Sequence, residues 1–276
     1  MIQDKYPMKP TDTPVRPGPA RSRLPSDLAP RVAVAVPAAA VLLALNHSGG
    51  LAFALPLALL GALGQAELAR LLSVPVRAAV PGCLAVGAAI LLALEDAALA
   101  PLALVAMPVA ALLGGRRAAL ATAGGLAWLG LCLAHAVLLR ELDHGAGLVV
   151  AVLLATFIGD TAAQLVGSAF GRRKLAPRIS PNKTVEGLAA GIVVGTAACV
   201  VASLFQDWHS TGDAVVLGLA CALAAPAGDL LESAIKRRAG VKDSGRLFGA
   251  HGGVLDRADA AMMAAFVGYW VTRALG

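Results

Sequence analysis

Residues 146–170, AGLVVAVLLATFIGDTAAQLVGSAF, form a long apolar run with one carboxylate, Asp160, inside it. A helix of this length crosses the hydrocarbon core of a bilayer, which is roughly 30 Å thick. In lipid every backbone amide and carbonyl needs a partner, and a helix supplies one within its own span. The stretch therefore predicts a membrane-spanning helix with a polar interruption at Gly159-Asp160-Thr161.

The rest of the chain has the same apolar character. Of its 276 residues, 58% are hydrophobic and 14% are charged, whereas soluble domains carry about a quarter charged residues. The apolar residues cluster into about nine candidate spans. These spans lie at about 32–46, 50–69, 76–94, 97–113, 118–139, 146–170, 185–205, 213–235 and 256–275. We expect an all-α polytopic membrane protein; the short first and fourth runs leave a count of eight open.

Basic residues alternate between the connections. The N-terminal segment and the connections near 70–77, 116–117, 172–183 and 236–246 are rich in Lys and Arg. Those near 46–49, 95–96 and 206–212 carry none, and the one near 140 carries a single arginine. Loops rich in Lys and Arg stay on the cytoplasmic side. The pattern predicts nine spans in the cell inner (plasma) membrane, with a cytoplasmic N-terminus and an external C-terminus.

Three segments differ in composition. Residues 1–30 hold seven prolines interleaved with charges, so they bury little apolar surface and are expected to form a disordered cytoplasmic tail. Residues 31–145 form the N-terminal transmembrane helices, and 146–276 form the C-terminal helices that carry the polar motifs. The site is therefore expected in the second half.

Polar residues enter the apolar second half at four places. These are 159–161, 174–187, 228–237 and 242–259. An ionised carboxylate in a membrane segment is costly and usually marks function. If 228–237 is helical, the side chains three, four and seven positions after Asp229 share its face. Asp256 and Asp259 share a face in the same way at the start of the last span.

Simpler interpretations exist for some of these features. Residues 174–187 could be only a basic cytoplasmic loop, with Thr184 or Asn182 capping the next helix. A stripe of small residues at Gly187, Gly191 and Gly195 ordinarily means close helix packing. Carboxylates at a helix N-terminus are favoured by the helix dipole. None of these interpretations accounts for the glycine-rich loop that precedes Asp256.

Carboxylates and cations on one side of a membrane indicate phosphate chemistry. Carboxylate pairs bind Mg²⁺, which bridges substrate phosphates, and Lys and Arg neutralise further phosphate charge. Nucleotidyl or phosphoryl transfer uses these groups. The chain has neither the histidine cluster of a zinc hydrolase nor a G-x-x-x-x-G-K phosphate loop.

Residues 233–237 (SAIKR), 242–245 (KDSG) and 247–259 (LFGAHGGVLDRAD) together resemble the signature of the phosphatidate cytidylyltransferase family. Upstream elements of the family also appear at 159–163 (GDTAA), 180–187 (SPNKTVEG) and 228–233 (GDLLES). The resemblance spans about 155–260. Gln164, where the family often has an aromatic residue, and Ala258, in place of a larger apolar residue, are departures that affect the shape of the site.

The resemblance implies transfer of CMP from CTP to phosphatidate, giving CDP-diacylglycerol and pyrophosphate in phospholipid biosynthesis. Asp229 and Asp256 match metal-binding aspartates, with Asp160 and Asp259 as further candidate ligands. The implied ion is Mg²⁺, with a monovalent cation such as K⁺ left open beside it. Ser233 and Lys236 match positions that act on the substrate phosphates, so the expected catalytic residues are these two with Asp229 and Asp256.

Further residues are expected to bind substrate. The candidates for the triphosphate and the lipid phosphate are Lys236, Lys242, Arg246 and Arg257. Those for the nucleotide side are Ser180, Asn182, Lys183 and His251. The implied partners are CTP from the cytoplasm, phosphatidate from the bilayer and membrane lipids. Small-residue helix faces leave a homodimer open, and no nucleic acid is expected.

Two other classes of function stay open at this stage. A transporter of an anionic metabolite would also bury charges, although it usually shows matching broken helices in both halves. An enzyme acting on another lipid phosphate or on a polyprenol could use the same residues. A CDP-alcohol phosphotransferase is disfavoured, because its Asp-Gly-x-x-Ala-Arg opening motif is missing.

Overall fold

The computed structural model describes residues 28–95, 103–206, 210–245, 247 and 252–276. The chain divides into two compact units, residues 1–43 and 44–276. The first contains most of helix α1 (Leu28–Ser48). Almost all of the predicted tail, residues 1–27, lies outside the described residues, as do Arg246 and His251. The site described below lies wholly within the second unit.

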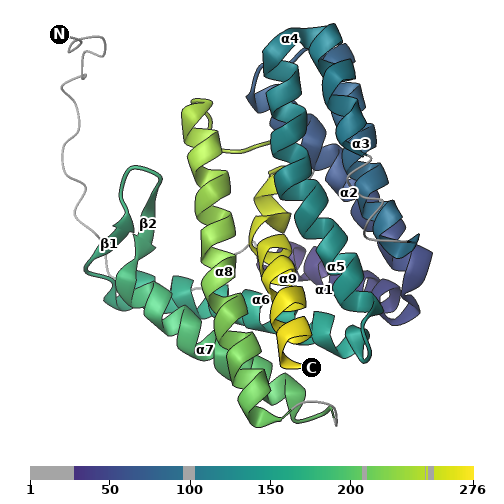
Figure 1. Cartoon of the computed structure of the whole chain (residues 1–276). Coiled ribbons are helices and arrows are strands. Elements are labelled where there is room, and N and C mark those ends of the chain that lie inside the picture. The colour runs from purple at the N-terminus through teal and green to yellow at the C-terminus, as the bar shows by residue number, and fades with distance from the viewer. Residues whose placement is uncertain (1–27, 96–102, 207–209, 246, 248–251) are drawn as a thin grey trace, which may run out of the picture. The chain divides into compact units, whose positions relative to one another are not determined.

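The second unit is a succession of helices joined by short connections (Figure 1). Their bounds lie within a few residues of the predicted spans, except between residues 106 and 141, where the helices begin and end at other positions. The helices are α2 (Gly50–Leu71), α3 (Val76–Glu95), α4 (Ala106–Gly125), the π-helical turn η2 (Leu126–Gly130), α5 (Leu131–Glu141), α6 (Gly145–Phe170), α7 (Val185–Ser203), α8 (Thr211–Arg238) and α9 (Leu255–Leu275).

Helix α4 is broken at Gly115. This residue has φ 67° and ψ −164°, a conformation that glycine adopts at no steric cost because it lacks a Cβ. The break falls between the predicted spans 97–113 and 118–139. Beyond it the chain stays helical through η2 and α5 to Glu141. Residues 96–102, where the earlier span was expected to begin, lie outside the described residues.

The helices have the character of an integral membrane protein. Among the described residues, six helical segments are long and apolar enough to cross a bilayer. Large apolar side chains also face outward: Leu112 is 87% exposed and Val193 is 68% exposed. Such outward side chains suit a lipid environment, which is as apolar as leucine. The count of nine spans and the orientation of the termini stay predictions.

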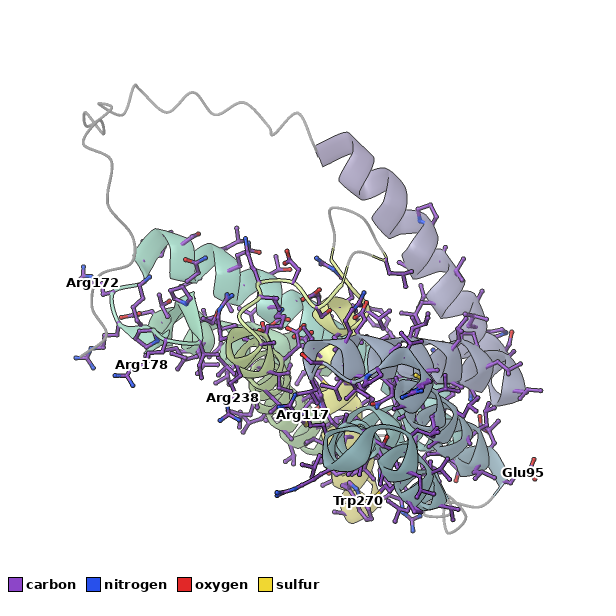
Figure 2. The ribbon with its side chains drawn as sticks, turned by 90° about the horizontal axis from the view of Figure 1, so that it is seen from above. Glu95, Arg117, Arg172, Arg178, Arg238 and Trp270 are labelled. Atoms are coloured by element: carbon purple, nitrogen blue, oxygen red, sulfur yellow. The ribbon has the colours of Figure 1, made fainter. Side chains whose placement is uncertain are left out.

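A two-stranded antiparallel hairpin was not predicted. Strands β1 (Lys174–Ala176) and β2 (Ser180–Thr184) pair between α6 and α7, where the sequence suggested only a polar loop. Figure 2 shows Arg172 and Arg178 pointing outward beside this hairpin, on the far side of the unit from Glu95.

The hairpin is fastened to the start of α7. Of the two predicted candidates, Thr184 caps this helix, because its hydroxyl accepts the Gly187 N–H at 3.1 Å. The Glu186 carboxylate accepts the backbone N–H groups of Arg172 and Arg173 at 3.1–3.2 Å. The two anchors hold β2 in a defined position over the end of α8.

Helices α6 and α7 approach closely along the predicted glycine stripe. A Cβ added at Gly191 would lie 2.9 Å from the Gly159 carbonyl oxygen, and one at Gly195 would lie 2.6 Å from that of Ala155. Only glycine permits this separation, so the packing interpretation of the stripe is confirmed. The contact also places the α6 segment that contains Asp160 beside α7.

Helix α9 packs against α8, which precedes it in the sequence, and against α5 from the middle of the unit. In Figure 1 it lies between the green α8 and the teal α5. The α8–α9 contact is the one that assembles the polar residues.

Candidate active site

The polar face of α8 forms as the spacing predicts. Asp229, Glu232, Ser233 and Lys236 all lie within one continuous helix. The Ser233 hydroxyl donates to Asp229 Oδ1 at 3.2 Å, so it orients that carboxylate. The face is turned toward the beginning of α9.

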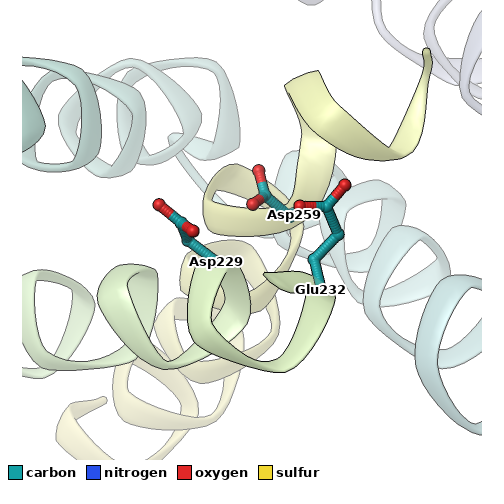
Figure 3. Close-up of side chains that lie close together, drawn as sticks. All are labelled: Asp229, Glu232 and Asp259. Carbon is teal, nitrogen blue, oxygen red and sulfur yellow. The ribbon is translucent and has the colours of Figure 1, made fainter. Parts of the chain in front are cut away.

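Gly228 allows α9 to come close to this face. A Cβ at Gly228 would collide with the backbone carbonyl of Asp259. Because Gly228 has no Cβ, α9 can approach, and Asp259 lies across from Asp229 and Glu232. Single carboxylate oxygens of these three residues lie within 4.8 Å of one another, and Figure 3 shows them gathered between α8 and α9.

Three carboxylates at this separation, two of them buried, repel one another unless cations neutralise them. Glu232 is 2% exposed and Asp259 is 8% exposed. Glu232 Oε1 is buried and has no hydrogen-bond partner among the described residues. An all-oxygen, multiply negative set with an unpartnered oxygen is the donor set that Mg²⁺ prefers. The residues present therefore fit a divalent cation.

Two lysines neutralise part of this charge. Lys236 Nζ lies 2.5 Å from Glu232 Oε2 and 2.6 Å from Asp256 Oδ1. Lys183 reaches from β2 to Asp229 Oδ2 at 2.7 Å. The hairpin thus contributes a charge to the site. Ammonium groups beside carboxylates are suited to hold the phosphates of a substrate.

Asp256 has a different environment from the one that the sequence suggested. Its Oδ2 accepts the Gly253 N–H at 2.7 Å and the Ser244 N–H at 3.0 Å, and the Ser244 hydroxyl oxygen lies 2.9 Å from it. Its Oδ1 accepts from Lys236. It lies outside the group of three carboxylates, which instead includes Glu232, a residue not proposed as a ligand. The role of Asp256 as a metal ligand remains a prediction.

Glu67 is a site residue that sequence reasoning missed. It comes from α2, in the other half of the chain, and is 4% exposed. Its Oε1 accepts the Val254 N–H at 3.1 Å, and its Oε2 accepts the Leu255 N–H and the Ser244 hydroxyl at 3.1 and 2.9 Å. A carboxylate inside a predicted span, at 50–69, was the signal that could have found it.

The other predicted residues lie on elements that contribute to this centre or on its neighbouring loop. Asp160, half-buried on α6, interacts electrostatically with Lys183 and Asp229. Ser180 and Asn182 lie on β2. Arg257 is exposed in the first turn of α9. Lys242 lines a cavity of about 760 Å³ beside Ser244. The arrangement can hold a divalent cation and several phosphate groups next to this cavity.

Comparisons with known proteins show which family this chain is similar to. A model of the cytidylyltransferase family matches residues 29–275. The phosphatidate cytidylyltransferase of Mycobacterium leprae is 39% identical over 153 residues, which cover 55% of this chain and 49% of the relative. That of Bacillus subtilis is 39% identical over 138 residues, or 48% of this chain and 50% of the relative.

An uncharacterized protein of Escherichia coli, YnbB, is also similar, with 39% identity over 133 residues that cover 48% of this chain and 45% of that protein. The chain thus spans about half the length of the curated relatives it matches.

Proposed function

The chain belongs to the cytidylyltransferase family, and from that premise we propose that it is a phosphatidate cytidylyltransferase. It would transfer CMP from CTP to phosphatidate and release pyrophosphate. One observation carries this proposal: Asp229, Glu232 and Asp259 gather between α8 and α9, and two lysines contact this cluster. The names of the Mycobacterium and Bacillus relatives support the same substrates.

The residues of the cluster suit transfer between two anionic substrates. Asp229, Glu232 and Asp259 would hold a Mg²⁺ ion, which would supply positive charge that offsets the charge of the phosphates. Lys236 and Lys183 add fixed positive charge at the edge of the carboxylate cluster. A monovalent cation such as K⁺ beside Mg²⁺ belongs to the same proposal.

The reaction then needs little acid–base chemistry. A phosphate oxygen of phosphatidate attacks the α-phosphorus of CTP; an O–P bond forms there while the bond from the α-phosphorus to the bridging oxygen of pyrophosphate breaks. The attacking oxygen is already ionised, so no general base is required. Positioning and charge neutralisation by the lysines and by the loop at 242–245 supply the catalysis.

The proposal includes the membrane arrangement. The chain would cross the inner membrane nine times, with the site open to the cytoplasm, where CTP is dissolved. Phosphatidate would reach the site from the surrounding bilayer. A homodimer is compatible with this arrangement but is not needed to complete the cluster, because all three carboxylates come from one chain.

Pyrophosphate release tests the proposal directly. The full chain, purified in detergent, is given CTP, Mg²⁺ and phosphatidate, singly and together. We expect release only when all three are present, and a loss of at least about 100-fold in Asp259→Asn, which removes one buried charge from the cluster. Asp143→Asn, an exposed change between α5 and α6, is the matched control and should keep full activity.

Two results would contradict the proposal in different ways. A folded protein that binds CTP but gives no pyrophosphate with phosphatidate would point to another lipid phosphate as the acceptor. A folded protein that does not bind CTP would exclude the nucleotidyl-transfer reaction altogether.

A further inference from the structure

Arg70, in the last turn of α2, lines two cavities of different character. The first, of about 760 Å³, is lined by charged and polar side chains such as Lys242 and Ser244 as well as by apolar ones such as Val241. The second, of about 440 Å³, is mostly apolar, and its wall includes Leu63, Ala66, Val74 and Ala79. Arg70 therefore stands at a boundary between a cavity that contains charged groups and a mostly apolar one.

The structure ties this boundary to the active site. Glu67, one turn before Arg70 on α2, accepts hydrogen bonds from Ser244 and from the first residues of α9. Ser244 in turn donates to Asp256, the partner of Lys236. Arg70 is an exposed residue, and the contact of its guanidinium with the Ser244 carbonyl, at 3.5 Å, is long. Arg70 is thus positioned beside the site while retaining donors for a ligand.

A molecule that fits both spaces has an anionic head and an apolar tail. Arginine binds phosphate oxygens with two parallel donors, and the apolar cavity gives a tail a place out of water. A phosphate in this position could belong to the lipid or to CTP. CTP has no apolar part that would occupy the second cavity, so the pair of cavities favours the lipid.

We propose that Arg70 binds the phosphate of the lipid substrate and that the adjacent apolar cavity takes part of an acyl chain. This inference rests on the proposed function and assigns a role to the N-terminal half, outside the stretch with the sequence signature. A cation at the C-terminal end of α2 also interacts favourably with the helix dipole. That effect would explain the charge of Arg70, but not the apolar cavity on its other side.

Steady-state kinetics of Arg70→Gln is the first test. Loss of a charge-assisted contact should raise KM for phosphatidate about tenfold or more and leave KM for CTP unchanged. Arg77→Gln is the matched control: Arg77 is an exposed arginine in the first turn of α3 that lines neither cavity, and it should change neither constant. A rise in KM for CTP alone would assign Arg70 to the triphosphate and overturn the proposal.

A second variant tests the apolar cavity without touching a charge. Ala66 is exposed to that cavity from α2, so Ala66→Phe fills the space with little effect on the core. We expect a higher KM for dioleoyl phosphatidate and a much smaller change for dihexanoyl phosphatidate. Equal effects on both lipids, or none on either, would exclude acyl binding in this cavity.

A binding measurement separates this inference from the proposed reaction. The full chain is titrated, without CTP, with mixed micelles that contain either phosphatidate or phosphatidylcholine. Wild type and Arg77→Gln should prefer phosphatidate, and Arg70→Gln should lose that preference; retention of the preference in Arg70→Gln would overturn the inference. If wild-type protein released no pyrophosphate, the reaction would be wrong, yet this titration would still decide whether Arg70 binds the lipid phosphate.

Discussion

Glu67 shows how one buried carboxylate organises a loop. It receives three hydrogen bonds from the segment that runs from Ser244 to Leu255. Gly245 and Gly253 lie directly against its oxygens, where a Cβ on either residue would collide with them. The absence of side chains at these two positions lets the backbone close around the carboxylate. A charge inside a mostly apolar helix is thus stabilised by backbone donors.

Glu67→Gln is predicted to loosen this loop. The amide keeps the shape of the side chain. Its NH₂ group, however, faces hydrogen-bond donors, whereas the carboxylate oxygen at that position accepts their hydrogen bonds. An unsatisfied buried group costs about 1–3 kcal/mol, so the thermal unfolding temperature in detergent should fall and activity should drop. Glu95→Gln, at the exposed end of α3, is the control. Equal unfolding temperatures and activities in the two variants would show that the Glu67 contacts do not hold the loop.

The individual site residues differ in how far they could be predicted. Lys236 and Asp229 lie on one face of α8 as their spacing indicated, because the helical period alone sets that relation. The inclusion of Glu232 in the carboxylate group, and the hydrogen bonds of Asp256 to the Ser244 loop, depend on how α8 and α9 meet. That contact is between two separate helices, and the periodicity of residues within one helix does not predict it.

At the scale of the elements, glycine positions set the distances between helices. Gly228 brings α9 against α8, and Gly159 with Gly191 brings α7 against α6. In lipid no hydrophobic effect drives helices together, so close backbone packing carries much of the association. The glycines therefore determine both the stability of the helix pairs and the separation of the groups that they carry.

Gly191→Leu is predicted to separate α6 from α7. A Cβ at this position would meet the Gly159 carbonyl at 2.9 Å, and a larger side chain forces the backbones apart at a cost of typically about 1–3 kcal/mol. The unfolding temperature in detergent should fall, and activity should fall with it because α6 and α7 support Asp160 and the hairpin. Ala189→Leu, on an exposed face of the same helix, should behave like wild type. A stable, active Gly191→Leu protein would contradict the packing role.

The hairpin β1–β2 was beyond reach of a pattern-based prediction. Strand β2 is SPNKT, a polar pentapeptide that has only one β-branched residue, Thr184, and lacks the alternation that indicates strands. It forms because Glu186 and Thr184 anchor its base and because Arg237 of α8 donates to the Ile179 carbonyl at its turn. Its strand form is therefore a consequence of contacts with α7 and α8.

For the molecule as a whole, the charge pattern and the fold agree in one respect. Within residues 44–276, the bend of α4 beside Arg116 and Arg117 lies at the same end as the basic C-terminal end of α8, and the C-terminus lies at the opposite end (Figure 1). This supports a basic, cytoplasmic side that carries the site.

The orientation can be measured with reporter fusions to the full chain. Nine spans put Met1 and Gly276 on opposite sides of the membrane, whereas eight put them on the same side. We predict that green fluorescent protein is fluorescent at the N-terminus and dark at the C-terminus, and that alkaline phosphatase is active only at the C-terminus. Cytoplasmic signals from both ends would contradict the nine-span arrangement.

Sequence alone was enough to predict the membrane class, the bounds of most helices and the polar face of α8, and it narrowed the cap of α7 to Thr184 or Asn182. These features follow from composition and from the repeat of polar and apolar residues along the chain. Both can be recognised within a single short segment. The three-dimensional arrangement was needed to show that Glu67 of α2 holds the loop before α9, that Glu232 joins Asp229 and Asp259, and that Arg70 stands between two cavities. These relations link elements that are separate in the sequence, and they depend on helix separations that are set by packing in three dimensions.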